Sequence, residues 1–306
     1  MAETQTTTAT TGRLTAWLSN PVTVKELRGR MRGRRAFAVL TLYLALLSGV
    51  IALVYLVYAS GANGVGSTAA RTAGKGLFAA VLAVQAFLVV FIGPAFTAGA
   101  ISGERERQTF DLLKTTLLSA ESVVLGKLIS ALSYVFLLVL VSIPLQSIAF
   151  LLGGLSLTEL LLSQLLILIA AVTYALYGLW CSATMRTTLA ATVATFGGML
   201  FAVFGVPLLA GMAAVLSSSL QLSGPVIEAT LLYTGLALAA TNLPATLIVS
   251  EVLFLEQNTL FFFSQFLYGT RVWLFSPWTL FIVLHILAAA VLYGLTVRRV
   301  RRVSDI

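Results

Sequence analysis

Six long apolar runs constrain this chain more than any other feature of its sequence. They cover 36–59, 77–101, 128–152, 160–181, 189–216 and 276–297. Each run is long enough to cross the roughly 30 Å hydrocarbon layer of a bilayer as a helix, which takes about 20 residues. Hydrophobic residues make up 59% of the chain and charged residues only 10%, which is far from the composition of a soluble domain. We therefore expect an all-α membrane protein with about six transmembrane helices.

A seventh apolar stretch, 229–266, differs from the other six. Pro244 interrupts it, and Glu251 and Glu256 lie within it. A proline and two carboxylates near the centre of a span would be costly. We interpret this stretch as a partly re-entrant helical pair, inside an external helical region over 217–275 that precedes the last span.

Positive charge is distributed unevenly over the connecting segments. If both termini are cytoplasmic, the inner segments hold 16 of the 19 lysines and arginines, and Arg71, Lys75 and Arg271 are the three outside. This asymmetry follows the positive-inside rule. A seventh crossing would instead place the basic cluster at 298–302 outside. The expected location is the cell (cytoplasmic) membrane, with both termini in the cytoplasm.

Two N-terminal segments precede the first span. Residues 1–12 form a threonine-rich tail without apolar periodicity, which is typical of disorder. Residues 13–35 carry apolar and basic residues on different faces of a helix, a pattern that predicts an amphipathic helix in the inner membrane interface, in contact with membrane lipids. An orientation signal without a further role is the alternative. The remaining residues, 36–306, are expected to form a single six-span domain.

The segment 102–118 is a dense cluster of charges in a chain that otherwise avoids charge. An apolar stripe at helical spacing begins at Phe110. The polar pairs at i, i+4 spacing are Glu104 with Gln108 and Arg107 with Asp111. These patterns predict a helix over 103–118 on the cytoplasmic side. Mixed charges beside apolar residues suit a specific protein contact, and a solvated loop helix is the alternative.

Residues suited to catalysis or metal binding are scarce. The chain has one cysteine, Cys181, and one histidine, His285, which excludes a disulfide within the chain and an ordinary Cys/His zinc site. We find no nucleotide-binding or catalytic motif, so we do not expect an enzyme. The basic residues lie at span ends and are not interleaved with exposed aromatics, so orientation and anionic headgroups explain them better than nucleic acid does.

A few polar residues fall inside the predicted spans. Gln85, Gln146, Gln164 and His285 could line a pathway through the membrane, or they could form hydrogen bonds that hold helices together. We favour the second role for all four. Pro207 is expected to kink its span, and Gly197-Gly198 to permit close helix contact or bending.

Two segments together resemble the ATP-binding-cassette (ABC) type-2 permeases. The first is Asn20-Pro21-Val22 with Lys25-Glu26-Leu27-Arg28, before the first span. The second follows the second span and reads Ile101-Ser102-Gly103-Glu104-Arg105-Glu106-Arg107-Gln108-Thr109-Phe110-Asp111-Leu112-Leu113, with Thr115 beyond it. The resemblance is specific in these segments and architectural over the rest of the chain.

This resemblance implies a stand-alone permease subunit of an ATP-driven transporter, working as an exporter. It implies no cofactor in this chain, because ATP and magnesium would bind a separate ABC ATPase subunit. It also implies pairing with a second permease copy or a homologous permease, and no nucleic-acid partner. The implied coupling-helix residues are Glu104, Arg105, Glu106, Arg107, Phe110, Asp111, Leu112 and Leu113. The implied residues of the flanking interfacial helix are Lys25, Glu26 and Arg28.

Two functions from other classes remain as alternatives. A secondary transporter usually shows internal repeats and carboxylates near the membrane midplane, and neither is evident in this sequence. A membrane assembly or scaffold protein that transports nothing is harder to exclude.

Overall fold

A computed structural model of the protein describes residues 34–61, 67–109, 119–153, 155–220, 224–257, 261–267 and 270–304. Within these ranges the chain is helical apart from turns and one short β-hairpin. The expected tail over 1–12 lies outside them. So does nearly all of the expected interfacial helix over 13–35, including Lys25, Glu26 and Arg28.

Six helical segments of the described chain are long and apolar enough to cross a membrane. They are α3 (Arg34–Gly61), α4 (Ser67–Thr97), α7 (Ala120–Leu151), α8 (Leu157–Thr184), the continuous run of α9 (Thr188–Leu200), η1 (Phe201–Gly205) and α10 (Val206–Ser219), and α13 (Pro277–Ser304). The six predicted spans are confirmed as helices, and the chain has the character of a membrane protein. Most of these helices extend beyond the apolar runs.

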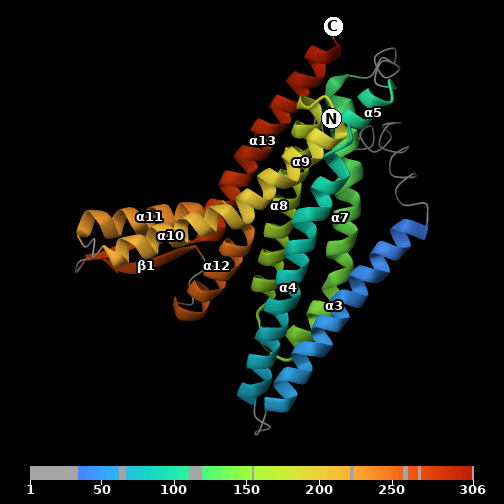
Figure 1. Ribbon diagram of the computed structural model, residues 1–306. Coiled ribbons are helices and arrows are strands. Elements are labelled where there is room, and N and C mark those ends of the chain that lie inside the picture. Colours follow the sequence, from blue (N-terminus) through green and yellow to red (C-terminus); the bar gives the residue numbers. More distant parts are fainter. Residues whose placement is uncertain are drawn as a thin grey trace, which may run out of the picture.

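Helix α8 lies at the centre of the bundle and packs against α4, α7, α9 and α13, while α3 crosses α4 and α7 (Figure 1). Small residues bring α4 and α8 together. A Cβ atom on Gly178 would lie 2.5 Å from Thr97 Oγ1 and 3.3 Å from the backbone of Pro94. Glycine is therefore required at position 178, since close helix approach in a bilayer depends on small side chains.

Three glutamines close a ring of hydrogen bonds in the middle of the bundle. Gln85 Nε2 of α4 donates to Gln164 Oε1 of α8 at 2.8 Å, and Gln164 Nε2 donates to Gln146 Oε1 of α7 at 2.8 Å. Gln146 Nε2 completes the ring by donating to Gln85 Oε1. All three side chains are buried. The predicted role of these glutamines as partners between helices is confirmed, and each helix contributes one donor and one acceptor.

The fifth span bends where its helix widens into the π-turn η1. Pro207 has no N–H, so it cannot bond a carbonyl of the preceding turn. Asn242 Nδ2 supplies donors instead, at 3.0 Å from the Ala202 carbonyl and 2.8 Å from the Val203 carbonyl. Beyond the bend, α10 leaves the bundle sideways (Figure 1) and has no buried residue. The predicted kink at Pro207 thus coincides with an exchange of hydrogen bonds.

A broken helix pair follows α10. It consists of α11 (Pro225–Ala240) and α12 (Leu243–Gln257), which meet at 119°. Asn242 forms the corner, because its Oδ1 accepts a hydrogen bond from Ala245 N at 3.0 Å and caps α12. A bend of this size is compatible with the predicted re-entrant pair and equally with one broken span.

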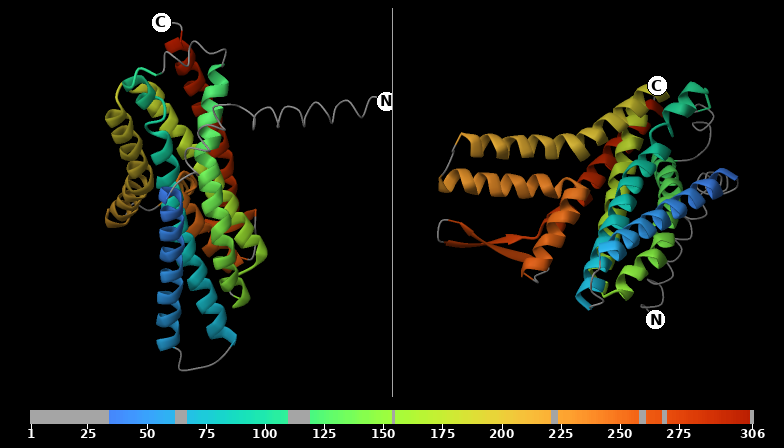
Figure 2. Two further views of the ribbon diagram at one scale, coloured as in Figure 1. Left: turned by 90° about the vertical axis from the view of Figure 1, so that its right-hand side faces the viewer. Right: turned by 60° about the horizontal axis from the view of Figure 1, so that its bottom comes forward.

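The prediction that the whole region before the last span is helical was wrong. Two strands, β1 (Phe262–Leu267) and β2 (Thr270–Phe275), pair antiparallel as a hairpin, with Phe262 opposite Phe275. The right-hand view in Figure 2 shows it beside α12, away from the central helices. Aromatic and β-branched residues on both sides of Gly269 favour two strands over a helix. High hydrophobicity concealed this signal.

The glutamine ring generates a prediction about stability. Gln146→Met should lower the free energy of unfolding by about 1–3 kcal/mol, because it leaves one buried donor and one buried acceptor unpaired. The triple variant Gln85→Met, Gln146→Met and Gln164→Met should lower the free energy of unfolding by much less than the sum of the three single changes. In the triple variant no buried amide is left without a hydrogen-bond partner. Unfolding of the purified protein in mixed micelles, followed by circular dichroism, measures both. A triple variant that costs the full sum would show that the ring is not a unit.

Candidate functional site

The charged segment after α4 lies at the end of the bundle that also holds the last turn of α13 (Figure 1). A turn over 98–101 leads into the short helix α5 (Ser102–Glu106). Ser182 Oγ of α8 accepts hydrogen bonds from Ile101 N at 2.9 Å and from Ser102 N at 3.0 Å. The hydroxyl of α8 therefore satisfies the first N–H groups of α5 and holds its start against the bundle.

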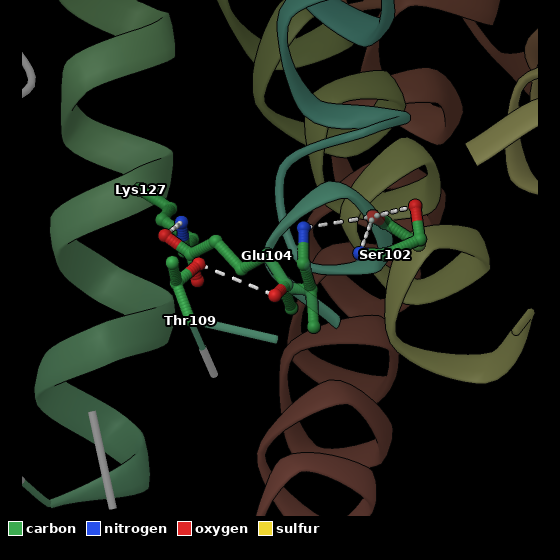
Figure 3. Close-up of polar contacts among 6 residues, drawn as sticks. Ser102, Glu104, Thr109 and Lys127 are labelled. Carbon is green, nitrogen blue, oxygen red and sulfur yellow. Dashed lines mark hydrogen bonds and ion pairs between the residues drawn. The ribbon is translucent and has the colours of Figure 1, made fainter. Parts of the chain in front are cut away.

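Glu104 connects α5 to α7. Its Oε1 lies 2.8 Å from Lys127 Nζ, and the two side chains are 28% and 2% exposed (Figure 3). Lysine is almost never buried to this extent unless it is paired. The ion pair therefore explains how Lys127 can lie inside the bundle, in the second turn of α7 and directly before the predicted span at 128–152.

Arg105 connects α5 to the end of α8. One guanidinium nitrogen donates to the Ala183 carbonyl at 2.9 Å and another to the Met185 carbonyl at 3.3 Å. The last carbonyls of a helix have no partner within it and carry partial negative charge. An arginine at this position satisfies both needs.

Glu106 connects α5 to the start of α9. Its carboxylate accepts hydrogen bonds from Thr188 N at 2.8 Å and from Thr188 Oγ1 at 2.7 Å. Thr188 is the first residue of α9, where free N–H groups favour a negative charge. Three consecutive charged residues of α5 therefore reach three different helix ends.

The structure corrects the helix expected over 103–118 in the part that it describes, 103–109. The helix ends at Glu106, and Gln108 adopts a positive φ of 56° in the turn that follows. The expected pair of Glu104 with Gln108 is also wrong, because Glu104 bonds to Lys127, 23 residues away. The contact of an acidic side chain with a buried ammonium outweighs a neighbour at helical spacing, which is worth only about 0.2–0.5 kcal/mol.

The remaining predicted site residues divide into two groups. Arg107 is described and exposed. Phe110, Asp111, Leu112 and Leu113 lie outside the described residues, together with the rest of 110–118. Sequence reasoning missed Lys127, Ser182 and Thr188 as partners of α5. For Lys127 one signal was present in the sequence, because it is a lone lysine directly before a long apolar run.

A weaker contact joins α7 and α13 at the same end. Arg301 Nη2 lies 3.4 Å from Glu121 Oε1, and both side chains are mostly exposed. Exposed pairs of this kind contribute little to stability. Its value here is geometric, since it shows that the first turn of α7 and the basic C-terminal turn of α13 lie together.

Other groups that could carry chemistry are used in packing. His285 Nδ1 lies 3.0 Å from the Phe281 carbonyl of its own helix, and its ring stacks on Phe281. The predicted packing role of His285 is the one the geometry favours. Among the described residues, no group of three or more His, Cys, Asp or Glu could hold a metal ion.

The ion pair of α5 gives a second stability prediction. Glu104→Gln should lower the free energy of unfolding by about 3 kcal/mol, because the buried ammonium of Lys127 loses this carboxylate. Lys127→Met should cost less, because the carboxylate that it leaves is the more exposed partner. Denaturation in mixed micelles measures both variants. The matched control is Glu121→Gln at the exposed pair, which should cost less than about 1 kcal/mol. Equal effects at Glu104 and Glu121 would contradict the importance of the buried pair.

No protein-family model matches the sequence, and no curated protein matches it. The case for a function therefore rests on the residues and the geometry described above.

Proposed function

We propose that the chain is the membrane permease subunit of an ATP-binding-cassette transporter, working as an exporter. A separate ATPase subunit hydrolyses ATP with magnesium, and the permease converts that cycle into movement of a substrate across the membrane. The permease acts together with a second copy of itself or a homologous permease. The resemblance of 20–28 and 101–115 to type-2 permeases suggests this function.

The observation that carries the proposal is the way α5 is attached. Glu104, Arg105 and Glu106 each hold a different helix, namely α7, the end of α8 and the start of α9. A partner that displaces α5 would therefore pull on three spans at once. Coupling of this kind needs an element whose position biases the packing of others, and α5 has the required contacts.

The charged segment then has two tasks. Glu104, Arg105 and Glu106 bind three helices of the bundle and transmit movement. Arg107 is exposed directly after them, so it is the described residue of this segment best placed to meet the ATPase. Charge at the edge of a protein contact fixes orientation and register, which suits this position.

A membrane scaffold remains the main competing function, because it also needs a charged surface. The two differ in what they bind and in what that partner does. A transporter subunit of this type requires a cytosolic ATPase whose activity depends on the permease, whereas a scaffold does not. Gentle purification through a tag on this chain should recover such an ATPase. Recovery of none would contradict the proposal.

Charge reversal tests the docking role directly. Arg107→Glu should lower the affinity of the permease for the ATPase at least about tenfold, because like charges across a contact are costly, while membrane insertion and the unfolding curve stay unchanged. Arg71→Glu is the matched control, since Arg71 is exposed at the other end of α4. Binding and ATPase assays on the reconstituted complex measure the effect. Normal binding and hydrolysis with Arg107→Glu would show that the docking assignment is wrong.

A further inference from the structure

The β-hairpin has two unlike faces. On one face Phe263 and Leu274 are buried and pack with Leu236 of α11. The opposite face, here called the outer face, carries alternate residues of both strands. Its members are Phe262, Ser264, Phe266, Arg271, Trp273 and Phe275. The aromatic side chains of this face are exposed, Phe266 to 71% and Trp273 to 62%.

Arg271 is the charged residue of this outer face. Its Nε donates to Ser264 Oγ at 3.1 Å, and its guanidinium carbon lies 5.8 Å from the centre of the Phe266 ring and 5.5 Å from that of Trp273. Cation–π contacts at these distances hold the guanidinium close to the two rings. The sequence has no acidic residue between Glu256 and Asp305. Acidic groups that are close in sequence therefore do not neutralise this charge.

Two physical constraints fix the surroundings of the hairpin. It has two strands, and among the described residues neither strand has a neighbour on its other edge. Backbone groups along an open sheet edge cannot face hydrocarbon without several kcal/mol of cost for each unpaired group. Conversely, a cluster of large exposed aromatics is unfavourable in bulk water. The headgroup layer of a bilayer meets both requirements, since it offers hydrogen bonds and an apolar boundary together.

The position of the hairpin agrees with this depth. Helix α12 precedes it, and Glu251 of α12 interacts electrostatically with Glu159 in the first turn of α8 and with Lys75 near the start of α4. These groups lie at the end of α4 and α8 that is opposite to α5. The hairpin therefore follows a helix that approaches the polar boundary of the spans.

We propose that the outer face of the hairpin binds phospholipid headgroups in the leaflet opposite α5. Its aromatic rings lie at the boundary between headgroups and acyl chains, and Arg271 pairs with lipid phosphate. Tryptophan is enriched at this boundary because its ring is apolar and its N–H is polar. Arginine adds charge attraction to anionic lipids. The function of this face is to anchor the broken helix pair beside the spans, whatever the chain transports.

Tryptophan fluorescence in vesicles tests the depth of the outer face. Trp17→Phe, Trp180→Phe and Trp278→Phe leave Trp273 as the single tryptophan of the full chain. Nitroxide on the lipid headgroup should quench Trp273 more than nitroxide in the middle of the acyl chain, and aqueous acrylamide should quench it weakly. The depth control is Phe87→Trp in a chain without other tryptophans, because Phe87 is exposed near the middle of α4. This control should show the reverse lipid preference.

Each other outcome overturns the proposal. Strong quenching by acrylamide alone would place the face in water, and strongest quenching by mid-chain nitroxide would place it in the hydrocarbon. Protection from all three quenchers would show that a protein, such as a second copy of the chain, covers it. These measurements need no ATPase, so their failure is distinct from failure of the proposed transport function.

A second variant tests the arginine. With Trp273 as the single tryptophan, replacing part of the phosphatidylcholine by phosphatidylglycerol should reduce acrylamide quenching, because anionic headgroups attract Arg271. Arg271→Gln should abolish this dependence on anionic lipid while the preference for headgroup nitroxide remains. The same dependence in both proteins would show that Arg271 does not bind lipid phosphate.

Discussion

Each hydrogen-bonding group that this chain carries into its apolar interior needs a partner there, because hydrocarbon offers none and an unpaired group costs several kcal/mol. The three buried glutamines meet this need by bonding to one another in a closed ring between α4, α7 and α8. Asn242 meets it twice, by donating to carbonyls beside the bend at Pro207 and by capping α12. The same requirement therefore joins the three central helices and fixes the corner of the broken helix pair.

Charged side chains also find partners at the end of the bundle that holds α5. Helix ends expose free N–H and C=O groups. Side chains of α5 bind these groups, an acidic one at a helix start and a basic one at a helix end. Glu106 lies at the start of α9 and Arg105 at the end of α8, while Glu104 compensates the buried charge of Lys127. These bonds make α5 part of the bundle at the same time as they place it at the surface. This attachment would suit the proposed coupling of α5 to an ATPase, and in that proposal Arg107 is the residue that meets the partner.

The β-hairpin exposes mainly aromatic residues, whereas α5 exposes mainly charged ones. The hairpin after α12 buries Phe263 and Leu274 against α11 and turns Trp273 and Phe266 outward around Arg271. A two-stranded ribbon is marginal by itself, so its stability depends on the helices on one side and on its surroundings on the other. If both proposals hold, coupling to the ATPase occurs at the end of the bundle with α5, and lipid contact occurs at the hairpin. The two roles would then lie in different parts of the chain.

The sequence alone determined the six spans, the broken helix pair and the partnership of the intramembrane glutamines, because these depend on local length, composition and the cost of burying polar groups. It also located the charged segment at 102–118. Only the tertiary structure decided which partners those charges take. Lys127 and Thr188 lie 23 and 82 residues from their carboxylates, and no helical spacing relates residues so distant in sequence. The hairpin was also decided by the tertiary structure. Pairing of two strands and packing of one face on α11 favour an extended chain, whereas hydrophobicity alone favoured a helix.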